Sequence, residues 1–273
     1  MVASPSKERP VVHVHRGPDA PPSLEETPVS VLRKMTFART SAVAFTGLIM
    51  VGVAGCGSSS TPAAANPAAA KTPTTSPSPT GPTPASLVAQ VGLKDADLAN
   101  GFTVKLIPGG DQVSGQVTLD NCGYNFTTES HRVARRQVAM LDATGKDASA
   151  SNEVVAYDSV EQATLALVEL RASVAHCPKN IFVAGAVAGA PALRYDSSGL
   201  VTEPNLPVKD NTVLMERVTP KGSTKPLFTV FVVERQGAVV DATYVLSTTK
   251  PTADELTSIM VLSSVTGKRL AST

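Results

Sequence analysis

Hydrophobic and polar residues alternate along the last third of the chain, and this pattern predicts a series of β-strands. The strand-like runs are residues 212–218, 227–235 and 238–246. In the second run, Phe228, Val230 and Val232 share one face while the opposite face is apolar too, so we expect a strand buried on both sides. Gln236-Gly237 separates the last two runs and predicts a tight hairpin, because Gly tolerates the positive φ of such turns.

Two segments show helical rather than strand periodicity. Ser159 with Gln162, and Thr252 with Glu255, have the spacing of N-terminal capping boxes. After Ser159, apolar residues recur at steps of three and four and predict a helix with one buried face: Val160, Ala163, Leu167, Leu170 and Val174. Leu256, Ile259, Met260 and Val261 begin a final helix. The mixed order predicts an α+β fold, with an antiparallel sheet that ends in a meander and at least two packed helices.

Shorter signals precede these elements. We expect the folded domain, residues 87–273, to begin near Leu87 and to have a short helix or turn around Asp95 and Asp97. The run Pro-Gly-Gly-Asp at residues 108–111 predicts a turn. Its glycine pair lacks the following Lys and helix of a phosphate loop. Further extended segments are expected at residues 103–107, 135–141, 153–157, 181–187 and 193–195, with a polar connection over 142–152.

The residues before the domain resemble a bacterial export signal. Arg33, Lys34 and Arg39 form a positive region before a short apolar core at residues 42–50, which stops well short of the about 20 residues that span a membrane. The core ends in the run Val-Ala-Gly-Cys at residues 53–56, which is similar to the lipobox of bacterial lipoproteins. This resemblance implies cleavage before Cys56, a diacylglycerol on its sulfur and an acylated new amino terminus. The alternative is a secretory signal with a chance cysteine.

The lipobox divides the chain into four parts. Residues 1–34 have prolines among charges and no apolar periodicity, so we interpret them as a disordered leader or as an artefact of an upstream start, with Met35 the true start. Residues 35–55 are the signal peptide. Residues 56–86 comprise the lipidated cysteine and a stalk rich in Ser, Thr, Pro and Ala. The predicted location is the extracytoplasmic face of the cell membrane, with the lipid anchor as the membrane partner.

Composition narrows the function classes. The formal net charge is +1 over 273 residues, which lacks the excess of Lys and Arg that a nucleic-acid partner requires. Trp is absent and aromatics are 4%, which disfavours a carbohydrate binder built on stacking platforms. The bias toward Ala, Val, Thr and Pro resembles that of actinobacterial proteins. No cofactor motif is recognised.

Two cysteines remain after the lipobox is accounted for. Cys122 and Cys177 lie in a domain predicted to be exported to an oxidising compartment, so a disulfide between them is the simplest interpretation. The alternative is a metal site that these cysteines form with His176. Because no Cys-x-x-Cys spacing is present, the sequence favours the disulfide and predicts no metal site.

His131 stands beside three arginines, and this group is the candidate ligand site. Arg132, Arg135 and Arg136 carry planar donors that bind carboxylate or phosphate in a bidentate manner. In a strand, however, Arg135 and Arg136 point to opposite faces, so the group is split. The alternative is a solvated or salt-bridged surface.

Catalytic candidates are few. His131 and His176 are the histidines after Cys56, and neither accompanies a Gly-x-Ser-x-Gly elbow. Carboxylate pairs for glycoside chemistry are not singled out by the sequence, although six acidic residues are eligible: Asp196, Glu203, Asp210, Glu216, Glu234 and Asp241. An enzyme is therefore the less favoured interpretation.

The domain also resembles a family of sensors. The opening Ala96-Asp97-Leu98 to Gly101-Phe102, one cysteine before the Arg-rich strand and another after the helix are similar to the PknH-type extracellular sensor domains of actinobacterial lipoproteins and receptor kinases. The resemblance implies an α+β domain with a ligand-binding cleft and without catalytic residues. We therefore expect a sensor-like domain that binds a small ligand or an envelope protein. The alternatives are an envelope hydrolase that uses His131 or a carboxylate pair, and a structural or secretion-accessory module.

Overall fold

The structure is a computed structural model that describes residues 81–185, 191–201 and 206–273. The predicted leader and signal peptide, Cys56 and nearly all of the predicted stalk lie outside the described residues. In chain order the elements are α2 (Pro84–Val91), η1 (Asp95–Asp97), β1 (Thr103–Leu106), η2 (Thr127–His131), β2 (Arg132–Leu141), β3 (Asp147–Tyr157), α3 (Val160–Ala175), β4 (Phe182–Val183), β5 (Leu193–Leu200), β6 (Asn211–Pro220), β7 (Leu227–Gln236), β8 (Val239–Ser247) and α4 (Ala253–Leu270).

The described strands form one eight-stranded sheet in the order β1-β2-β3-β8-β7-β6-β5-β4. Every neighbouring pair is antiparallel. Strands β1 to β3 make one meander and β4 to β8 make a second, and the pairing of β3 with β8 joins the two. The predicted α+β class, antiparallel sheet and C-terminal meander are confirmed.

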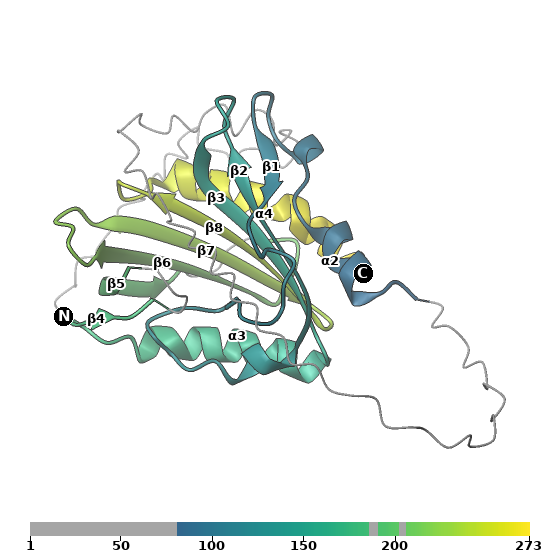
Figure 1. Ribbon diagram of the computed structural model, residues 1–273, viewed down its shortest axis with the longest axis horizontal. Coiled ribbons are helices and arrows are strands. Elements are labelled where there is room, and N and C mark those ends of the chain that lie inside the picture. The colour runs from purple at the N-terminus through teal and green to yellow at the C-terminus, as the bar shows by residue number, and fades with distance from the viewer. Residues whose placement is uncertain (1–80, 186–190, 202–205) are drawn as a thin grey trace, which may run out of the picture.

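Helices cover both faces of this sheet (Figure 1). Helix α3 packs on one face, where Leu167 and Leu170 share an apolar cluster with Val233 of β7. Helices α2 and α4 pack on the other face, where Ile259 of α4 shares a second cluster with Val232. Strand β7 is therefore buried on both sides, as its sequence predicts. The predicted hairpin is confirmed as well, since Gly237 between β7 and β8 has φ of 54°.

The predicted helix starts are confirmed by hydrogen bonds. The Ser159 side chain accepts a bond from the Gln162 backbone N–H at the start of α3. Thr252 and Glu255 form a complete capping box at the start of α4. One predicted core residue of α3 is wrong, because Val160 is 48% exposed. It is the first residue of the helix.

Several element boundaries differ from the sequence interpretation, and strand β5, expected at residues 193–195, extends over Leu193–Leu200. Strand β3 begins at Asp147, within the stretch expected to be a polar connection. Its small polar residues pair with β8 through contacts such as Ser151 with Tyr244, so a distant partner decides their conformation. Strand β2 begins at Arg132, where Tyr157 of β3 is its partner. Helix α2 begins at Pro84, inside the segment assigned to the stalk, because the preceding Thr83 caps its N-terminus.

A pair of carboxyl groups is enclosed between α4 and the sheet. Glu234 of β7 lies directly opposite Asp241 of β8, and both residues are 0% exposed. Ser263 of α4 donates to Glu234 at 3.0 Å, and Thr266 donates to Asp241. Gly267 permits this approach, because a Cβ there would come within 2.5 to 2.8 Å of the Glu234 carboxylate. The helix is thus held to the sheet by hydrogen bonds to buried acids.

Burial makes both acids hard to ionise. It raises the pKa of Glu234 to about 7, and the neighbouring Asp241 adds to that rise. It also raises the pKa of Asp241 to about 6, although bonds from Thr266 and Asn152 oppose the rise. The folded state therefore binds protons more tightly than the unfolded chain, in which these groups have pKa values of about 4. The resulting stability is fully present below about pH 4 and is lost as the pH rises toward about 7.

We predict that the free energy of unfolding falls between pH 5 and pH 8, and that Glu234→Gln makes this fall smaller because the amide does not titrate. Urea unfolding followed by circular dichroism at four pH values measures the slope. Glu161→Gln, on the exposed side of α3, is the matched control and should keep the native slope. Equal slopes for native protein and Glu234→Gln would contradict the prediction.

Candidate functional site

An irregular segment, residues 107–126, follows β1 in the chain and precedes η2 and β2. It crosses the α3 face of the sheet and forms the roof of the candidate site. Its first turn is bonded to β2, since Gln137 N–H donates to the Gly110 carbonyl at 2.7 Å and Ile107 N–H donates to that of Gln137 at 3.2 Å. Glycine is required at position 110, because a Cβ there would lie 2.3 Å from the Gln137 oxygen. We call residues 107–126 the roof segment.

Arg132 fastens the middle of the roof segment to the sheet. Its guanidinium donates to the Thr118 hydroxyl at 2.8 Å, to the Val113 carbonyl at 3.0 Å and to the Gln116 carbonyl. Its Nε donates to the Glu129 carbonyl, and its Nη2 lies 3.1 Å from the Glu129 carboxylate. The side chain is 5% exposed, so these contacts replace the water that a guanidinium otherwise binds.

Arg135 forms a buried ion pair with Glu153 of β3, and the two side chains are each 1% exposed. The guanidinium also donates to the Gly109 carbonyl and to the Gln137 side chain. Glu153 accepts further bonds from Thr118 at 3.0 Å and from the Tyr244 phenol at 3.1 Å. Burial raises the pKa of Glu153, although these partners act to lower it. The charge of the Arg135 guanidinium opposes the rise most strongly, so it is the main group that stabilises the buried carboxylate.

The structure brings Arg132 and Arg135 of the predicted ligand site into one buried network through Thr118 and Glu153, and it places His131 and Arg136 elsewhere. Arg132 and Arg135 are buried and donate to protein acceptors, whereas Arg136 points to the opposite face, beside Gly92. His131 lies at the surface, with its Nδ1 2.8 Å from the Asp158 carboxylate and the two side chains 40% and 45% exposed. The split between neighbouring arginines is as expected for a strand. Anion binding by these residues stays a prediction, and the geometry gives Arg132 and Arg135 the role of holding the roof segment.

A disulfide ties the end of the roof segment to the end of α3. Cys122 and Cys177 are bonded across a Cα–Cα distance of 4.9 Å, which confirms the predicted bridge. The alternative metal site does not fit, because both sulfurs are used and His176 Nδ1 lies 2.8 Å from the Ala172 carbonyl. In the described ranges no group of three or more His, Cys, Asp or Glu side chains is placed to hold a metal ion.

Glu169 of α3 holds η2, and the sequence interpretation did not single it out. Its carboxylate accepts four hydrogen bonds, from the backbone N–H groups and hydroxyls of Thr127 and Thr128, at 2.5 to 3.3 Å. Burial acts to raise the pKa of Glu169, but these donors outweigh it and the pKa is lowered. A carboxylate bonded to residues 41 and 42 positions away leaves no local signature in the sequence.

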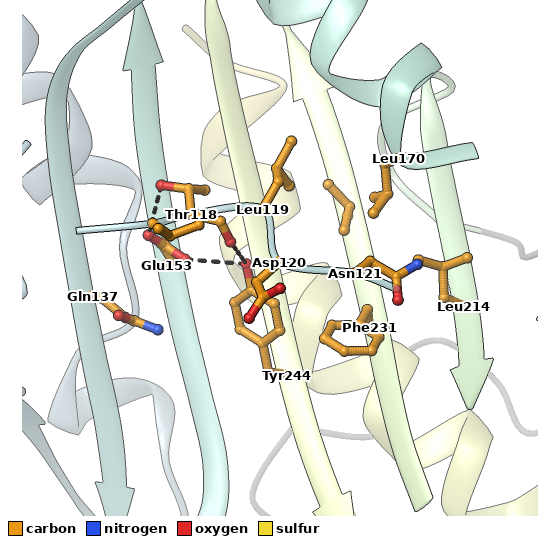
Figure 2. A pocket seen from close by; sticks show the side chains of 12 residues that line it. Thr118, Leu119, Asp120, Asn121, Gln137, Glu153, Leu170, Leu214, Phe231 and Tyr244 are labelled. Carbon is orange, nitrogen blue, oxygen red and sulfur yellow. Dashed lines mark hydrogen bonds between the residues drawn. The ribbon is translucent and has the colours of Figure 1, made fainter. Parts of the chain in front are cut away.

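A cavity of about 200 Å³ lies between the roof segment, α3 and the sheet (Figure 2). Its walls combine an apolar lining with a few polar side chains. The apolar residues are Val117, Leu119, Leu170, Leu214, Phe231 and Val233. The polar residues are Thr118, Asp120, Asn121, Gln137, Glu153 and Tyr244. Small-molecule sites commonly have this make-up, in which apolar walls provide contact and a few polar groups fix orientation.

Asn121 is the residue of the cavity wall with an unmet hydrogen-bonding group. It is 3% exposed, and its Nδ2 donates to the Ser173 hydroxyl of α3 at 2.8 Å. Its Oδ1 is buried and accepts no hydrogen bond. An unsatisfied buried acceptor costs the folded state about 1–3 kcal/mol.

Aromatic and acidic groups complete the wall. The rings of Phe231 and Tyr244 meet edge to face with centroids 5.3 Å apart. Burial raises the pKa of the Tyr244 phenol well above its ordinary value and the Glu153 carboxylate raises it further, so the phenol stays protonated and donates. Among the described residues, Asp120 and Glu153 are the acidic side chains of the lining, and none of the described lining residues is Lys, Arg or His.

The sequence interpretation missed most of this wall. Leu170, Phe231 and Val233 were expected as core residues, and Asp120 and Asn121 were not expected to have any role. The signal available in the sequence was the polar pair directly before Cys122, because a bridged cysteine fixes its neighbours against the element to which it is bonded.

The eligible carboxylates also have defined surroundings. Glu234 and Asp241 form the one cross-strand pair among them in the described residues, and they are enclosed under α4 rather than open to a substrate. Asp196 pairs with Arg194, and Asp210 pairs with Arg171 and Arg235. Burial raises the pKa of Glu216 to about 7 despite hydrogen bonds from Ser198, Thr229 and Asn121. Glu203 lies outside the described residues.

In the described part of the chain, every helix is too short or too polar to cross a membrane.

Among known proteins, the similarity found is to solved structures. No family model matches the chain, and no curated protein matches it. Among solved structures, the chain is similar to the crystal structure of the extracellular domain of PknH from Mycobacterium tuberculosis. The likeness covers 69% of this chain and 98% of that chain, with 10% sequence identity and a TM-score of 0.43. Because that TM-score is low, the function of this chain has to be argued from its own site.

We predict that Arg135→Met destabilises the fold by about 3–5 kcal/mol, because it leaves the Glu153 carboxylate buried without its cation. The double variant Arg135→Met/Glu153→Gln should recover part of this loss, since neither residue then carries a charge. Urea unfolding at pH 7 measures both values. Arg136→Met, on the opposite face, is the matched control. A loss for Arg135→Met no larger than that of the control would show that the ion pair is not needed.

Proposed function

We propose that this chain is a lipid-anchored extracytoplasmic protein whose folded domain binds a small molecule in the cavity beneath the roof segment. The cavity is the observation that carries the proposal. Its volume of about 200 Å³ is lined by apolar side chains and a few polar groups, and one of these, Asn121 Oδ1, has no hydrogen-bond partner. A purely structural or accessory module has no need for such a cavity.

Binding is favoured over catalysis by the groups in the wall. Glu153 is engaged by Arg135, Thr118 and Tyr244, so it is restrained as a binding or structural group. None of the lining residues that the structure describes is His, Cys or Ser, which supply most activated nucleophiles and bases. The His131–Asp158 contact, which an envelope hydrolase would use, lies outside the cavity wall.

The proposed location of the protein rests on its sequence. The positive leader, short apolar core and Val-Ala-Gly-Cys run at residues 53–56 favour export and lipid attachment at Cys56. Each buried CH₂ of an acyl chain contributes about 0.8 kcal/mol, so two or three chains anchor the protein stably. The disulfide is consistent with an extracytoplasmic location, because such bridges persist in oxidising compartments.

We predict that Cys56→Ala moves the protein from the membrane fraction to the soluble fraction and removes the acyl mass. Detergent partitioning and intact mass spectrometry of material from a bacterial host that processes lipoproteins measure the two effects. Ser58→Ala, two residues further on, is the control and should stay in the membrane fraction with its acyl mass. Unchanged partitioning and mass for Cys56→Ala would refute the anchor.

We predict that a thermal-shift screen of the detergent-solubilised native chain against small envelope metabolites, sugars and short peptides finds a stabilising ligand. A ligand at 100 times its Kd stabilises the folded state by about 2.7 kcal/mol. Leu214→Phe fills the cavity and should abolish the shift. Leu200→Phe changes a residue that is 50% exposed on β5 and should retain the shift. A shift that survives Leu214→Phe would place the ligand elsewhere.

A further inference from the structure

We propose that the ligand of this cavity is a small neutral molecule with a carbonyl oxygen on an apolar body, an inference that rests on the proposed binding function. Three features of the wall point to this class (Figure 2). A fixed amide N–H group is directed into the cavity, the lining lacks a counter-ion for a charged ligand, and the larger part of the lining surface is apolar.

The Gln137 side chain of β2 offers a hydrogen-bond donor to the cavity. Its backbone is held on both sides, because its N–H donates to Gly110 and its carbonyl accepts from Ile107. Its Oε1 accepts a hydrogen bond from the Arg135 guanidinium. Because a guanidinium has only donors, this bond fixes which end of the amide is the oxygen and leaves Nε2 as the other end. Figure 2 shows this nitrogen directed toward Tyr244, across the cavity. An acceptor oxygen is the ligand group that suits such a donor.

Neighbouring polar groups of the wall are already paired within the protein. The Glu153 carboxylate forms its ion pair with Arg135 and accepts hydrogen bonds from the Thr118 hydroxyl and the Tyr244 phenol. The Thr118 hydroxyl also accepts from Arg132. These side chains therefore need no hydrogen bond from a ligand, and the Gln137 amide is the group of this part of the wall that a ligand oxygen satisfies.

The acceptor is neutral because the wall does not suit a ligand of either charge. A carboxylate would lie near the acidic groups of Asp120 and Glu153, and none of the described lining residues is Lys, Arg or His. An ammonium group has only donors, so it would oppose the N–H groups of Gln137. Asp120 and Glu153 both have interactions within the protein, so neither is assigned as its counter-ion. A carbonyl oxygen accepts from Gln137 without burying a charge.

The remaining lining suits a compact apolar body. Phe231 and Tyr244 meet edge to face with ring centroids 5.3 Å apart and provide aromatic surface. Apolar cavities of about 150 Å³ accept a molecule of the size of benzene. At about 200 Å³ this cavity has room for a ring of that size with a small substituent. The aliphatic contact comes from Val117, Leu119, Leu170, Leu214 and Val233.

The test compares two neutral probes of the same shape, cyclohexanone and methylenecyclohexane, which differ by an oxygen in place of a CH₂ group. Ligand-observed NMR titrations of the detergent-solubilised native chain measure both Kd values. Gln137→Glu keeps an acceptor for Arg135 and replaces the N–H donor by an oxygen. It should lower the ratio of cyclohexanone affinity to methylenecyclohexane affinity about tenfold, because a hydrogen bond is replaced by repulsion between two oxygens.

Matched variants check the location of the contact. Gln112→Glu makes the same chemical change at an exposed residue of the roof segment outside the lining set, and it should leave the ratio unchanged. Leu214→Phe fills the cavity and should abolish binding of both probes. Circular dichroism and urea midpoints first establish that each variant keeps its fold. If Leu214→Phe does not fold, Val233→Ile narrows the same cavity by a smaller group and should weaken both probes.

The outcomes separate this inference from the binding function itself. Cyclohexylammonium and cyclohexanecarboxylate have the same ring and opposite charges, and both should bind more weakly than cyclohexanone. Tighter binding of either one, abolished by Leu214→Phe, would overturn the neutral class while the binding function stands. A ratio that Gln137→Glu leaves at its native value would overturn the carbonyl contact. If none of the four probes binds, the inference fails, and the wider metabolite screen then judges the binding function.

Discussion

The buried contact of Arg135 with Glu153 is the constraint on which the candidate site depends. It joins β2 to β3, and the same guanidinium donates to the Gly109 carbonyl at the start of the roof segment. Glu153 in turn accepts hydrogen bonds from Thr118 of the roof segment and from Tyr244 of β8. A buried charge has to be compensated by neighbouring donors and acceptors, so this one pair sets the separation between the roof segment and the sheet. That separation determines the shape of the cavity.

The two faces of the sheet use buried acids differently. Beneath α4, Glu234 and Asp241 face each other and receive bonds from neutral donors, so protonation relieves their burial. Beneath the roof segment, Glu153 is paired with Arg135 and its charge is compensated. The first arrangement couples the attachment of α4 to pH, and the second maintains a polar cavity wall. Both lie beside the central strands β7 and β8, whose burial on two faces requires cover from both sides.

Much of the fold followed from local pattern, and little of the site did. Alternation identified β6 to β8, and the caps at Ser159 and Thr252 located both long helices. Arg135 was recognised as unusual, but its partner is 18 residues away and its role is internal. Asn121 depends on Ser173, 52 residues away, and Glu169 depends on Thr127, 42 residues away. Such pairs leave no periodicity, so pattern alone does not identify them.

The sequence by itself determined the α+β class, the hairpin at Gly237, the helix starts and the pairing of two cysteines, because these depend on periodicity, on the φ of glycine, on short-range capping and on counting. It also carries the whole argument for Cys56. The tertiary structure decided that residues from Asp147 onward form a strand, that the roof segment crosses the sheet, and which carboxylates meet. Those outcomes depend on contacts between distant parts of the chain, whose free energies exist only once the sheet has formed.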